Sequence, residues 1–473
     1  MLGRIEEEKE LLDAESSPRS EFIAVYGRRR IGKTFLVQSV FDGRFSFVHT
    51  GLAKSTAKIQ LRKFRSSLRD AGLGDCSVLK DWFDAFEELQ RLLKGLDAKR
   101  KIVFIDEMPW LDTPRSNFVS ALENFWNGWA ARRSDILLIV CGSATSWIIE
   151  NVLRDKGGLH NRVTRQISLK PFSLGECERF VQSQGLALSR SEIAEAYMVF
   201  GGVPWYWSLL RPGRSVAQEI DRLFFSEGAV LAGEFRALFD SLFRTGSQHV
   251  KVVEALASRR SGMTRAELAV ATALPENGAL TRMLEELEQC GFIRAYRPFG
   301  ARRKGTTYQL VDCFSLFHHR FLSVDSASAG IEGFWMGTLE SGPRRAWTGL
   351  AFELVGLLHL RQIRRSLGIG GVLCGAYSWR STAEGVPGAQ IDLVIDRADK
   401  VVDLCEMKWS ESPYRIDKAE HEAIVRRKEA FIAETRTNKA VHCVLVASSG
   451  MEHNKYSGAI QAVVTLDDLF SVP

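Results

Sequence analysis

Short runs of apolar residues stand out in the first 170 residues of the chain. Three of them, FIAVY at 22–26, IVFI at 102–105 and ILLIVCG at 136–142, are bounded by polar residues or glycine. Such runs predict buried strands. Because TFLVQSVF, shortly after the first run, has helical apolar spacing, strand and helix alternate and an α/β fold is expected.

Helical periodicity dominates the middle of the chain. From Leu174 to Leu242, Gly and Pro separate the helical stretches, and helix-length segments then begin near positions 249, 264 and 278. Two strand-like runs, FIRAYRP and TTYQLVD, follow. Three helices and a hairpin predict a winged helix. Thr264 lies three residues before Glu267, the spacing of an N-cap and its capping-box partner.

The pattern changes again after Ser323. The residues from Ser323 to Gly342 are mostly small and polar, with several glycines, which predicts a linker. Its two bulky residues are expected to pack against a neighbouring part of the chain. Beyond it the predicted elements are a helix over 347–363, strands over 372–380, 389–397 and 400–410, a helix over 416–434 and a strand over 439–448. This is the element order of a restriction-endonuclease core.

Composition sets bounds on the fold. A chain of 473 residues is too long for one hydrophobic core, and 45% hydrophobic with 25% charged residues is typical of folded domains. The net charge of +6 supports no general claim about nucleic acid. Eight scattered cysteines without a C-x-x-C pair favour buried thiols in a reducing compartment over zinc sites or disulfides.

Neither export nor a membrane span is predicted. The N-terminal MLGRIEEEKELL is acidic where a signal peptide begins with basic residues. The most apolar run, at 136–142, is far shorter than the roughly 20 residues of a membrane helix. A cytoplasmic location without a membrane partner is therefore expected.

The stretch GRRRIGKT, Gly27 to Thr34, matches the phosphate-loop pattern G-x-x-x-x-G-K-[ST] between a predicted strand and helix. Backbone amides and the helix N-terminus of such a loop hold a polyphosphate, Lys33 reaches the β and γ phosphates, and Thr34 offers its hydroxyl to Mg²⁺. ATP and Mg²⁺ are the expected cofactors. The residues expected around the nucleotide are Gly27, Arg28, Arg29, Arg30, Ile31, Gly32, Lys33, Thr34 and Phe35. The arginines would contribute amides and point outward, to add counter-charge near the γ phosphate or to pair with an acidic surface.

The second predicted strand ends in two acids, Asp106 and Glu107. A phosphate loop needs a carboxylate opposite its threonine to hold Mg²⁺, so Asp106 is expected at the metal and Glu107 is expected to polarise the attacking water. Ser143 ends the next strand, where it serves either as a γ-phosphate sensor or as a simple strand-ending turn. Arg162 and Arg165 lie on a predicted loop and are either arginine-finger candidates or members of a solvated basic loop.

These motifs together resemble the prokaryotic AAA+-like ATPases of the STAND-related lineage. The resemblance rests on GRRRIGKT, VFIDE, GSATSW, GLHNRVTRQISLKPFSL and GGVPWYW. It implies a parallel-sheet P-loop core, a helical lid with Gly201 to Pro204 near the nucleotide, and an opening Gly3-Arg4 near the base.

Charge in the predicted winged helix leaves its partner open. Thr281 and Arg282 lie on the polar side of its third helix, which a winged helix offers to a DNA groove. A cationic wing is predicted from Arg294, Arg297, Arg302, Arg303 and Lys304, with no acidic residue between Phe292 and Val311. The acidic Glu285, Glu286 and Glu288 on the third helix favour a protein-docking role instead.

The last predicted domain carries a second set of chemical groups. Asp392 is expected opposite the apolar face of Ile391, Leu393 and Ile395, and Glu406 and Lys408 share a strand face because they are two residues apart. Two carboxylates, Asp392 and Glu406, could bind Mg²⁺ while the lysine activates water. The set resembles the PD-(D/E)xK nuclease superfamily, with Glu353 matching its helix acid and Ile391 replacing its leading proline.

The resemblance as a whole implies five parts: a P-loop ATPase core at 1–170, a helical lid at 171–242, a winged helix at 243–322, a linker at 323–345 and a restriction-endonuclease-like domain at 346–473. The expected function is an ATPase whose nucleotide state regulates a nuclease-like module acting on DNA. The alternative is an ATP-dependent signalling or scaffold switch with a catalytically inactive recognition domain, which a change of homo-oligomeric state would report. An ATP-driven DNA motor is less attractive, because no helicase-type motif follows the loop.

Overall fold

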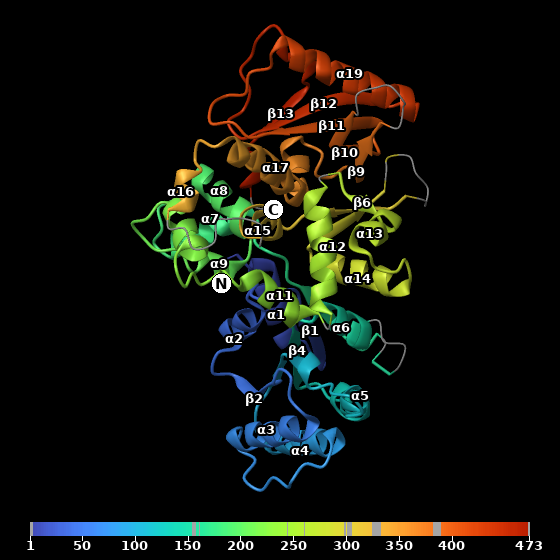
Figure 1. The fold of residues 1–473 in the computed structure, drawn as a ribbon. Coiled ribbons are helices and arrows are strands. Elements are labelled where there is room, and N and C mark those ends of the chain that lie inside the picture. Colours follow the sequence, from blue (N-terminus) through green and yellow to red (C-terminus); the bar gives the residue numbers. More distant parts are fainter. Residues whose placement is uncertain are drawn as a thin grey trace. The chain divides into compact units, whose positions relative to one another are not determined.

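The protein forms two compact units in its computed structural model (Figure 1). The first unit contains residues 1–170 and 241–244, and the second contains residues 171–240 and 245–473. The structure describes residues 3–153, 158–159, 161–243, 245–259, 261–297, 299, 305–323, 333–381 and 389–471.

The first unit is built on a five-stranded parallel sheet with the order β2-β3-β4-β1-β5. The strands are β1 (Glu21–Tyr26), β2 (Phe45–Thr50), β3 (Lys101–Asp106), β4 (Ile136–Gly142) and β5 (Arg165–Ser168). The three predicted strands are confirmed as β1, β3 and β4. Every residue of β3 and β4 is buried, as expected of central strands covered on both faces.

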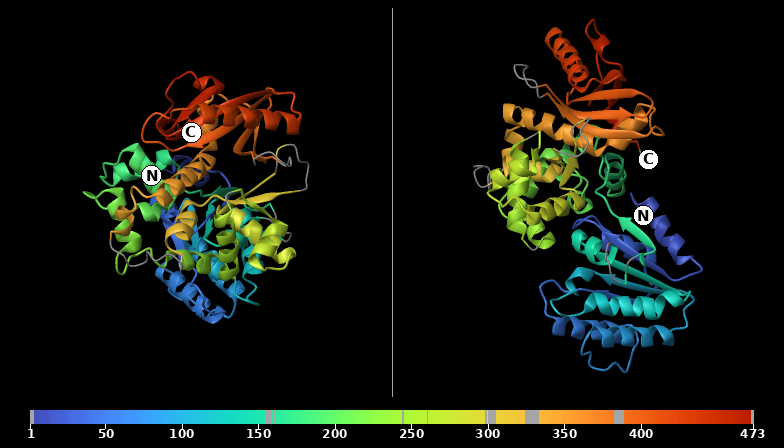
Figure 2. Two further views of the ribbon diagram at one scale, coloured as in Figure 1. Left: turned by 45° about the horizontal axis from the view of Figure 1, so that its top comes forward. Right: turned by 90° about the vertical axis from the view of Figure 1, so that its right-hand side faces the viewer.

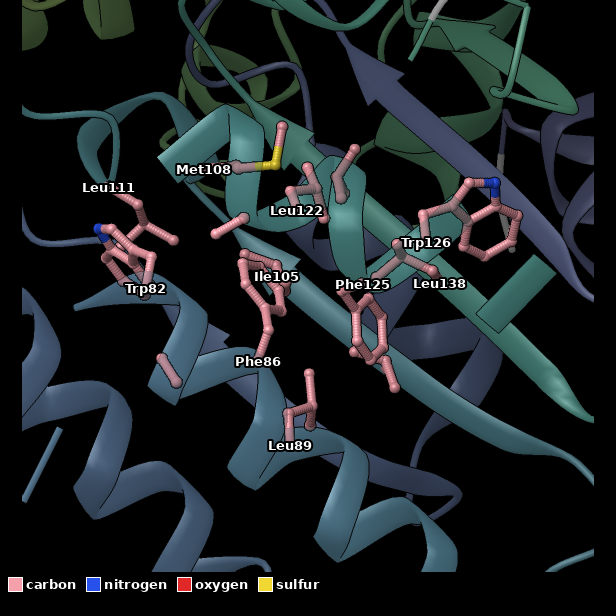
Figure 3. Packing of buried hydrophobic residues seen from close by; sticks show 14 of the residues in the cluster. Trp82, Phe86, Leu89, Ile105, Met108, Leu111, Leu122, Phe125, Trp126 and Leu138 are labelled. Atoms are coloured by element: carbon pink, nitrogen blue, oxygen red, sulfur yellow. The ribbon is translucent and has the colours of Figure 1, made fainter. Parts of the chain in front are cut away.

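Helices cover both faces of this sheet. They are α1 (Ile5–Glu15), α2 (Lys33–Phe41), α3 (Ala57–Asp70), α4 (Trp82–Gly95), α5 (Phe118–Gly128) and α6 (Thr145–Ile148). Ile105 and Leu138 join the hydrophobic layer under α3, α4 and α5, whereas their neighbours Phe104 and Ile139 join the layer under α1 and α2. Figure 3 shows Trp82 and Phe86 of α4 in the first of these layers. The alternation along each strand thus decides which layer a side chain enters.

The second unit begins with a helical region. Its helices are α7 (Leu174–Ser183), α8 (Arg190–Phe200), α9 (Pro204–Trp207), α10 (Val216–Ile220) and α11 (Glu234–Leu242), of which the last two residues belong to the first unit. Capping boxes formed by Ser173 with Glu176 and by Ser189 with Glu192 start α7 and α8. These caps satisfy backbone N–H groups that the first helical turn leaves free.

Three helices and a small antiparallel sheet follow. They are α12 (Gly246–Ser258), α13 (Arg265–Thr272) and α14 (Gly278–Gln289), with strands β6 (Met263–Thr264), β7 (Ile293–Tyr296) and β8 (Thr307–Leu310) in the order β6-β8-β7. The capping box of Thr264 and Glu267 is confirmed. The two-residue strand β6 was not predicted.

The segment predicted as a linker contains a folded anchor. Helix α15 (Cys313–Phe321) precedes it, and α16 (Phe334–Gly337) and α17 (Gly342–Leu358) follow residues 324–332, which lie outside the described residues. Trp335 is 1% exposed, and Asp221 accepts hydrogen bonds from its backbone N–H and from that of Met336. Helix α17 begins at Gly342, five residues before the predicted start, because Ser341 caps it and Pro343 suits its first turn.

A mixed five-stranded sheet forms the C-terminal part of the second unit. Its order is β13-β12-β11-β10-β9, antiparallel from β9 to β11 and parallel from β11 to β13. The strands are β9 (Cys374–Arg380), β10 (Gln390–Arg397), β11 (Val401–Lys408), β12 (Ala440–Ala447) and β13 (Ala462–Thr465). The helices are α18 (Leu360–Ser366), α19 (Lys418–Thr435) and α20 (Leu466–Leu469). Figure 2 shows α17 and α19 on opposite sides of this sheet.

Candidate nucleotide-binding site

The glycine-rich loop connects the end of β1 to the start of α2. Gly27 has φ +145° and Gly32 has φ +86°, backbone angles that favour glycine. A Cβ atom at Gly27 would lie 2.5 Å from the carbonyl oxygen of Leu169 and 2.5 Å from Cδ1 of Ile31. The first glycine is therefore required by both angle and space, and the second forms the left-handed N-cap of α2.

Lys33 and Thr34 are the first two residues of α2. The Lys33 side chain lies over the loop, and the Thr34 side chain points toward β3. The Nζ of Lys33, which is 5% exposed, donates to the Arg28 carbonyl oxygen at 3.0 Å. The hydroxyl of Thr34 donates to Oδ2 of Asp106 at 2.7 Å. The loop and the predicted acid thus meet through this hydroxyl.

The position of Asp106 follows from the alternation of β3. Phe104 packs in the layer under α1 and α2, so Asp106, two residues further, points to the same face and reaches the start of α2. Asp106 is 4% exposed, and its Oδ1 accepts from the Glu107 backbone N–H at 2.9 Å. Both carboxylate oxygens therefore have hydrogen-bond donors.

Glu107 and Ser143 form a second contact beside Asp106. The Ser143 hydroxyl lies 2.7 and 2.9 Å from the two carboxylate oxygens of Glu107. The sheet order explains this contact, because β4 lies beside β3 and Ser143 directly follows β4. Glu107 has φ +45° and ψ +41°, and its carbonyl oxygen would lie 2.5 Å from a Cβ atom at Gly51. Non-glycine residues held in the left-handed region are concentrated at functional sites.

Sequence reasoning missed Cys141 as a neighbour of the acids. Its thiol is fully buried, and burial raises its pKa well above the ordinary value, with the Asp106 carboxylate adding to the effect. The thiol is therefore protonated beside Asp106 at neutral pH. A cysteine inside an apolar run gave no signal of this, because its proximity depends on the pairing of β3 with β4.

The expectation that all three loop arginines point outward is wrong for Arg28. Its side chain is 3% exposed, whereas Arg29 and Arg30 are half-buried. Arg30 has φ +69°. Phe35, in contrast, is 64% exposed on α2 next to Thr34. The loop therefore leaves an aromatic ring at its surface and takes one guanidinium inside.

Arg162 and Arg165 lie near the start of β5, at the end of the strands away from the loop. Arg165 is the first residue of β5, not a loop residue as predicted, and it pairs with Ile23 in the parallel register. Its guanidinium lies 4.0 Å from Glu21, at the start of β1, whereas the loop follows the end of β1. Arg162 is exposed and precedes β5. Arg165 therefore does not reach the loop of its own chain.

The structure brings Glu406 and Lys408 together on the α19 side of the C-terminal sheet. The Nζ of Lys408 lies 3.3 Å from Glu406 and 3.1 Å from Glu420, and Arg427 of α19 lies 3.3 Å from Glu406. Burial opposes the charge of Lys408, but the two carboxylates raise its pKa. Glu420 and Arg427 were not predicted, because i to i+7 spacing on α19 marks a helix face but not the strand beneath it.

Asp392 has a different environment. A register shift between Ile391 and Val394 interrupts the pairing of β10 with β9, so Ile391 joins Val394 and Trp379 under α19 instead of sharing a face with Leu393. The predicted alternation around Asp392 is therefore wrong, and a β-bulge is the reason. Gln390 donates to Oδ1 of Asp392 at 2.6 Å, and Arg294 of β7 donates to its backbone oxygen at 3.2 Å.

Glu353 of α17 lines a pocket with Gln309 of β8 and Leu256 of α12. Within the described parts of the chain, no group of three or more His, Cys, Asp or Glu residues is arranged to hold a metal ion. The structure therefore does not bring Glu353, Asp392 and Glu406 together as one metal-binding group.

The hairpin of β7 and β8 packs on the C-terminal sheet. The ring of Phe299 lies tilted at 5.0 Å from that of Phe431 in α19 and edge-on at 5.7 Å from that of Tyr377 in β9. Arg294 donates to Gln309 at 2.9 Å and lies over the Tyr296 ring. Of the predicted cationic wing, Arg294 is therefore engaged inside the unit, Arg297 is exposed, and Arg302, Arg303 and Lys304 lie outside the described residues.

Residues 2–210 match a protein family described as an ATPase domain predominantly from Archaea. The match covers the phosphate loop, both acids, Ser143 and the GGVP segment. The N-terminal region of the chain is therefore similar to P-loop ATPase domains, and it is built on a parallel α/β sheet. Helices in the described parts of the chain are each too short or too polar to cross a membrane.

Relatives of the chain extend beyond this domain. A protein of Methanocaldococcus jannaschii, named an uncharacterized protein, is 24% identical over 415 residues, which are 87% of this chain and 88% of that protein. A Walker-type ATPase of Pyrococcus abyssi superposes with a TM-score of 0.49 at 19% identity, covering 68% of this chain and 96% of its own. The ORC2 protein of Aeropyrum pernix has a TM-score of 0.41 at 15% identity, covering 67% of this chain and 92% of its own.

Proposed function

We propose that the chain binds ATP with Mg²⁺ at residues 27–34 and hydrolyses it. The contact between the Thr34 hydroxyl and the Asp106 carboxylate, 2.7 Å apart, carries this proposal. A hydroxyl and a carboxylate are the hard oxygen ligands that suit Mg²⁺, so the residues fit the metal and Thr34 and Asp106 would hold it. Bound there with the nucleotide, Mg²⁺ supplies positive charge to the phosphates.

The remaining side chains have separate roles in this proposal. Lys33 exchanges the Arg28 carbonyl oxygen for phosphate oxygens. Glu107 accepts a proton from the attacking water and so makes the water a better nucleophile. Ser143 holds the Glu107 carboxylate by hydrogen bonding until the nucleotide is in place. Phe35 offers an exposed ring beside the loop.

Two variants test hydrolysis. Lys33→Ala removes a phosphate ligand, and Glu107→Gln removes the acceptor of the water proton while keeping a similar shape. ATP turnover, measured as phosphate release, should fall in both, whereas ATP binding should be lost only in the first. Lys58→Ala, which removes an exposed lysine of α3, is the matched control. Turnover that equals the wild type in both variants removes the ATPase assignment.

We also propose that the second unit responds to the nucleotide state, with a lid at 171–242, a winged helix at 243–322, a short linker and a nuclease-like domain at 346–473. The packing of Phe299 on Phe431 supports a switch in which the wing docks within the protein. Exposed Arg282 and Arg297 keep DNA as a possible partner of this part. The exposure of Arg162 supports assembly with further copies of the chain, to which it would offer its guanidinium.

The C-terminal domain has two candidate roles. The pairing of Glu406 with both Lys408 and Arg427 supports a recognition role, because a carboxylate held by two cations is a poor metal ligand. The adjacent Glu406 and Lys408 on one strand, in the element order described above, support a metal-dependent nuclease. Nicking of supercoiled plasmid with Mg²⁺ or Mn²⁺, with and without ATP, decides between them. Cleavage that disappears in Lys408→Ala supports the nuclease, and cleavage that persists in it places the chemistry elsewhere.

A further inference from the structure

The side chain of Arg4 lies between the phosphate loop and the end of the first unit. It is 3% exposed although it is charged. Its Nη2 donates to the Lys170 carbonyl oxygen at 2.7 Å and to the Ile31 carbonyl oxygen at 3.4 Å, and its Nη1 lies 3.4 Å from Glu7. A buried guanidinium that reaches two backbone carbonyls fixes these two chain segments relative to each other.

The Ile31 carbonyl belongs to the peptide group that also carries the Gly32 N–H. In a planar trans peptide the carbonyl and the N–H point in opposite directions. If the Gly32 N–H faces a bound phosphate, as in the proposed nucleotide site, the other side of the same peptide group faces Arg4. A rotation of this peptide group on phosphate binding therefore changes the contact with Arg4 directly.

Lys170 is the last residue of the first unit before the chain enters the second. The residue before it is bound to the loop region as well, because the Leu169 N–H donates to Tyr26 at 2.8 Å and its carbonyl oxygen packs against Gly27. Pro171 follows, with its fixed φ and no N–H group. The exit from the first unit is thus short, stiff and in contact with the nucleotide loop.

The next residue is held equally tightly within the second unit. The Phe172 N–H donates to the Gly202 carbonyl oxygen at 2.6 Å, and the Tyr197 hydroxyl donates to the Phe172 carbonyl oxygen at 2.8 Å. A Cβ atom at Gly202 would lie 1.9 Å from the Phe172 carbonyl oxygen, so only glycine permits this approach. One proline therefore separates a residue bound to the phosphate loop from a residue bound to the GGVP segment.

We propose that Arg4 is a positioning residue that transmits the state of the phosphate loop to the GGVP segment through Lys170, Pro171 and Phe172. This inference rests on the proposed ATP binding. It differs from a role of Arg4 at the nucleotide base, because its guanidinium contacts backbone carbonyls on the protein side of the loop. Loss of Arg4 should leave the nucleotide affinity nearly unchanged. It should remove the effect of the bound nucleotide on the second unit.

Hydrogen–deuterium exchange of the full-length protein with and without a non-hydrolysable ATP analogue tests this. In the wild type, the analogue should change exchange in peptides covering the phosphate loop and in peptides covering 172–174 and 201–203, by about fivefold or more. In Arg4→Met the change should remain in the loop and disappear from the other peptides. Arg4→Lys keeps the charge without the planar fork and should restore stability but not the transmission. Glu7→Gln, which leaves both carbonyl contacts intact, is the matched control and should behave as the wild type.

The outcomes separate the inference from the proposed function. Wild-type protein that binds no analogue by calorimetry overturns the ATP site and the inference with it. Wild-type protein that binds the analogue, with a response at 172–174 that persists in Arg4→Met and Arg4→Lys, overturns the inference alone. An affinity loss above about tenfold in Arg4→Lys assigns the residue to nucleotide binding and also overturns it. A response confined to the loop in the wild type shows that no transmission exists.

Discussion

The buried His359 makes the stability of the second unit sensitive to acid. Its ring is 1% exposed, Nδ1 lies 2.7 Å from the Val355 carbonyl oxygen, and Nε2 accepts from the Leu174 N–H at 2.9 Å. This arrangement requires the neutral ring with its proton on Nδ1. A second proton on Nε2 would face the Leu174 N–H and remove its acceptor.

Burial lowers the pKa of His359 from 6.5 to about 4, although the Val355 carbonyl raises it slightly. The unfolded chain therefore takes up this proton at higher pH than the folded protein, so stability falls as pH decreases from 6.5 toward 4. Linkage gives a loss of about 1.4 kcal/mol at pH 5.5 and about 2.5 kcal/mol at pH 4.5 from this group alone. Above pH 6.5 the ring is neutral in both states and contributes no pH dependence.

Urea unfolding of wild type and His359→Gln at pH 7.5, 6.5, 5.5 and 4.5 measures this loss. Glutamine can accept from the Leu174 N–H but does not titrate, so its carboxamide serves as the comparison. Buried His49 and half-buried His318 also have pKa values lowered to about 4 by burial, and they add the same pH dependence to both proteins and cancel in the difference. The difference in unfolding free energy between the two proteins should shrink as the pH falls. Parallel pH profiles would refute the assignment of a neutral, acceptor-only Nε2.

Three further substitutions test other parts of the account. Gly27→Ala should cost more than about 2 kcal/mol and abolish ATP binding, because its Cβ would contact Leu169 at 2.5 Å, whereas Gly74→Ala, with open space around it, should do neither; equal melting temperatures for the two contradict this. Trp335→Ala should lower the unfolding free energy by about 3–5 kcal/mol if this residue is a core anchor, and a loss below about 1 kcal/mol would return it to a linker. Arg162→Ala should lower ATP turnover without changing ATP affinity if the arginine serves a neighbouring copy, and unchanged turnover excludes that role.

The phosphate loop could be predicted from the sequence because its chemistry is local. Gly27 and Gly32 are identified by spacing alone, and the two acids follow a strand that is recognisable by its apolar run. The contact between Thr34 and Asp106 follows once the strand before the loop and the strand that ends in Asp106 belong to one parallel sheet. Local pattern and tertiary structure therefore agree in this part of the chain.

Other features depend on pairings between distant segments. That β4 lies between β1 and β3, and so brings Ser143 to Glu107, is a property of the sheet order and not of any single stretch. The burial of Arg28 depends on how the loop packs. The alternation around Asp392 was misread because one register shift moves Ile391 to the other face.

The predicted cationic wing shows the same limit. Five basic residues in the sequence indicate a surface for nucleic acid, yet the structure turns Arg294 toward Asp392 and packs Phe299 against Phe431. A basic residue count cannot show which side chains the rest of the unit covers. A binding measurement, and not the number of basic residues, therefore identifies the partner of this part of the chain.

Calorimetric titration of the full-length protein with ATP and Mg²⁺ tests the central claim most directly. The account predicts saturable binding of one nucleotide per chain, weakened when Mg²⁺ is chelated and lost in Lys33→Ala, with Lys58→Ala as the control. An absence of binding at millimolar ATP, or binding that Lys33→Ala leaves intact, would contradict it.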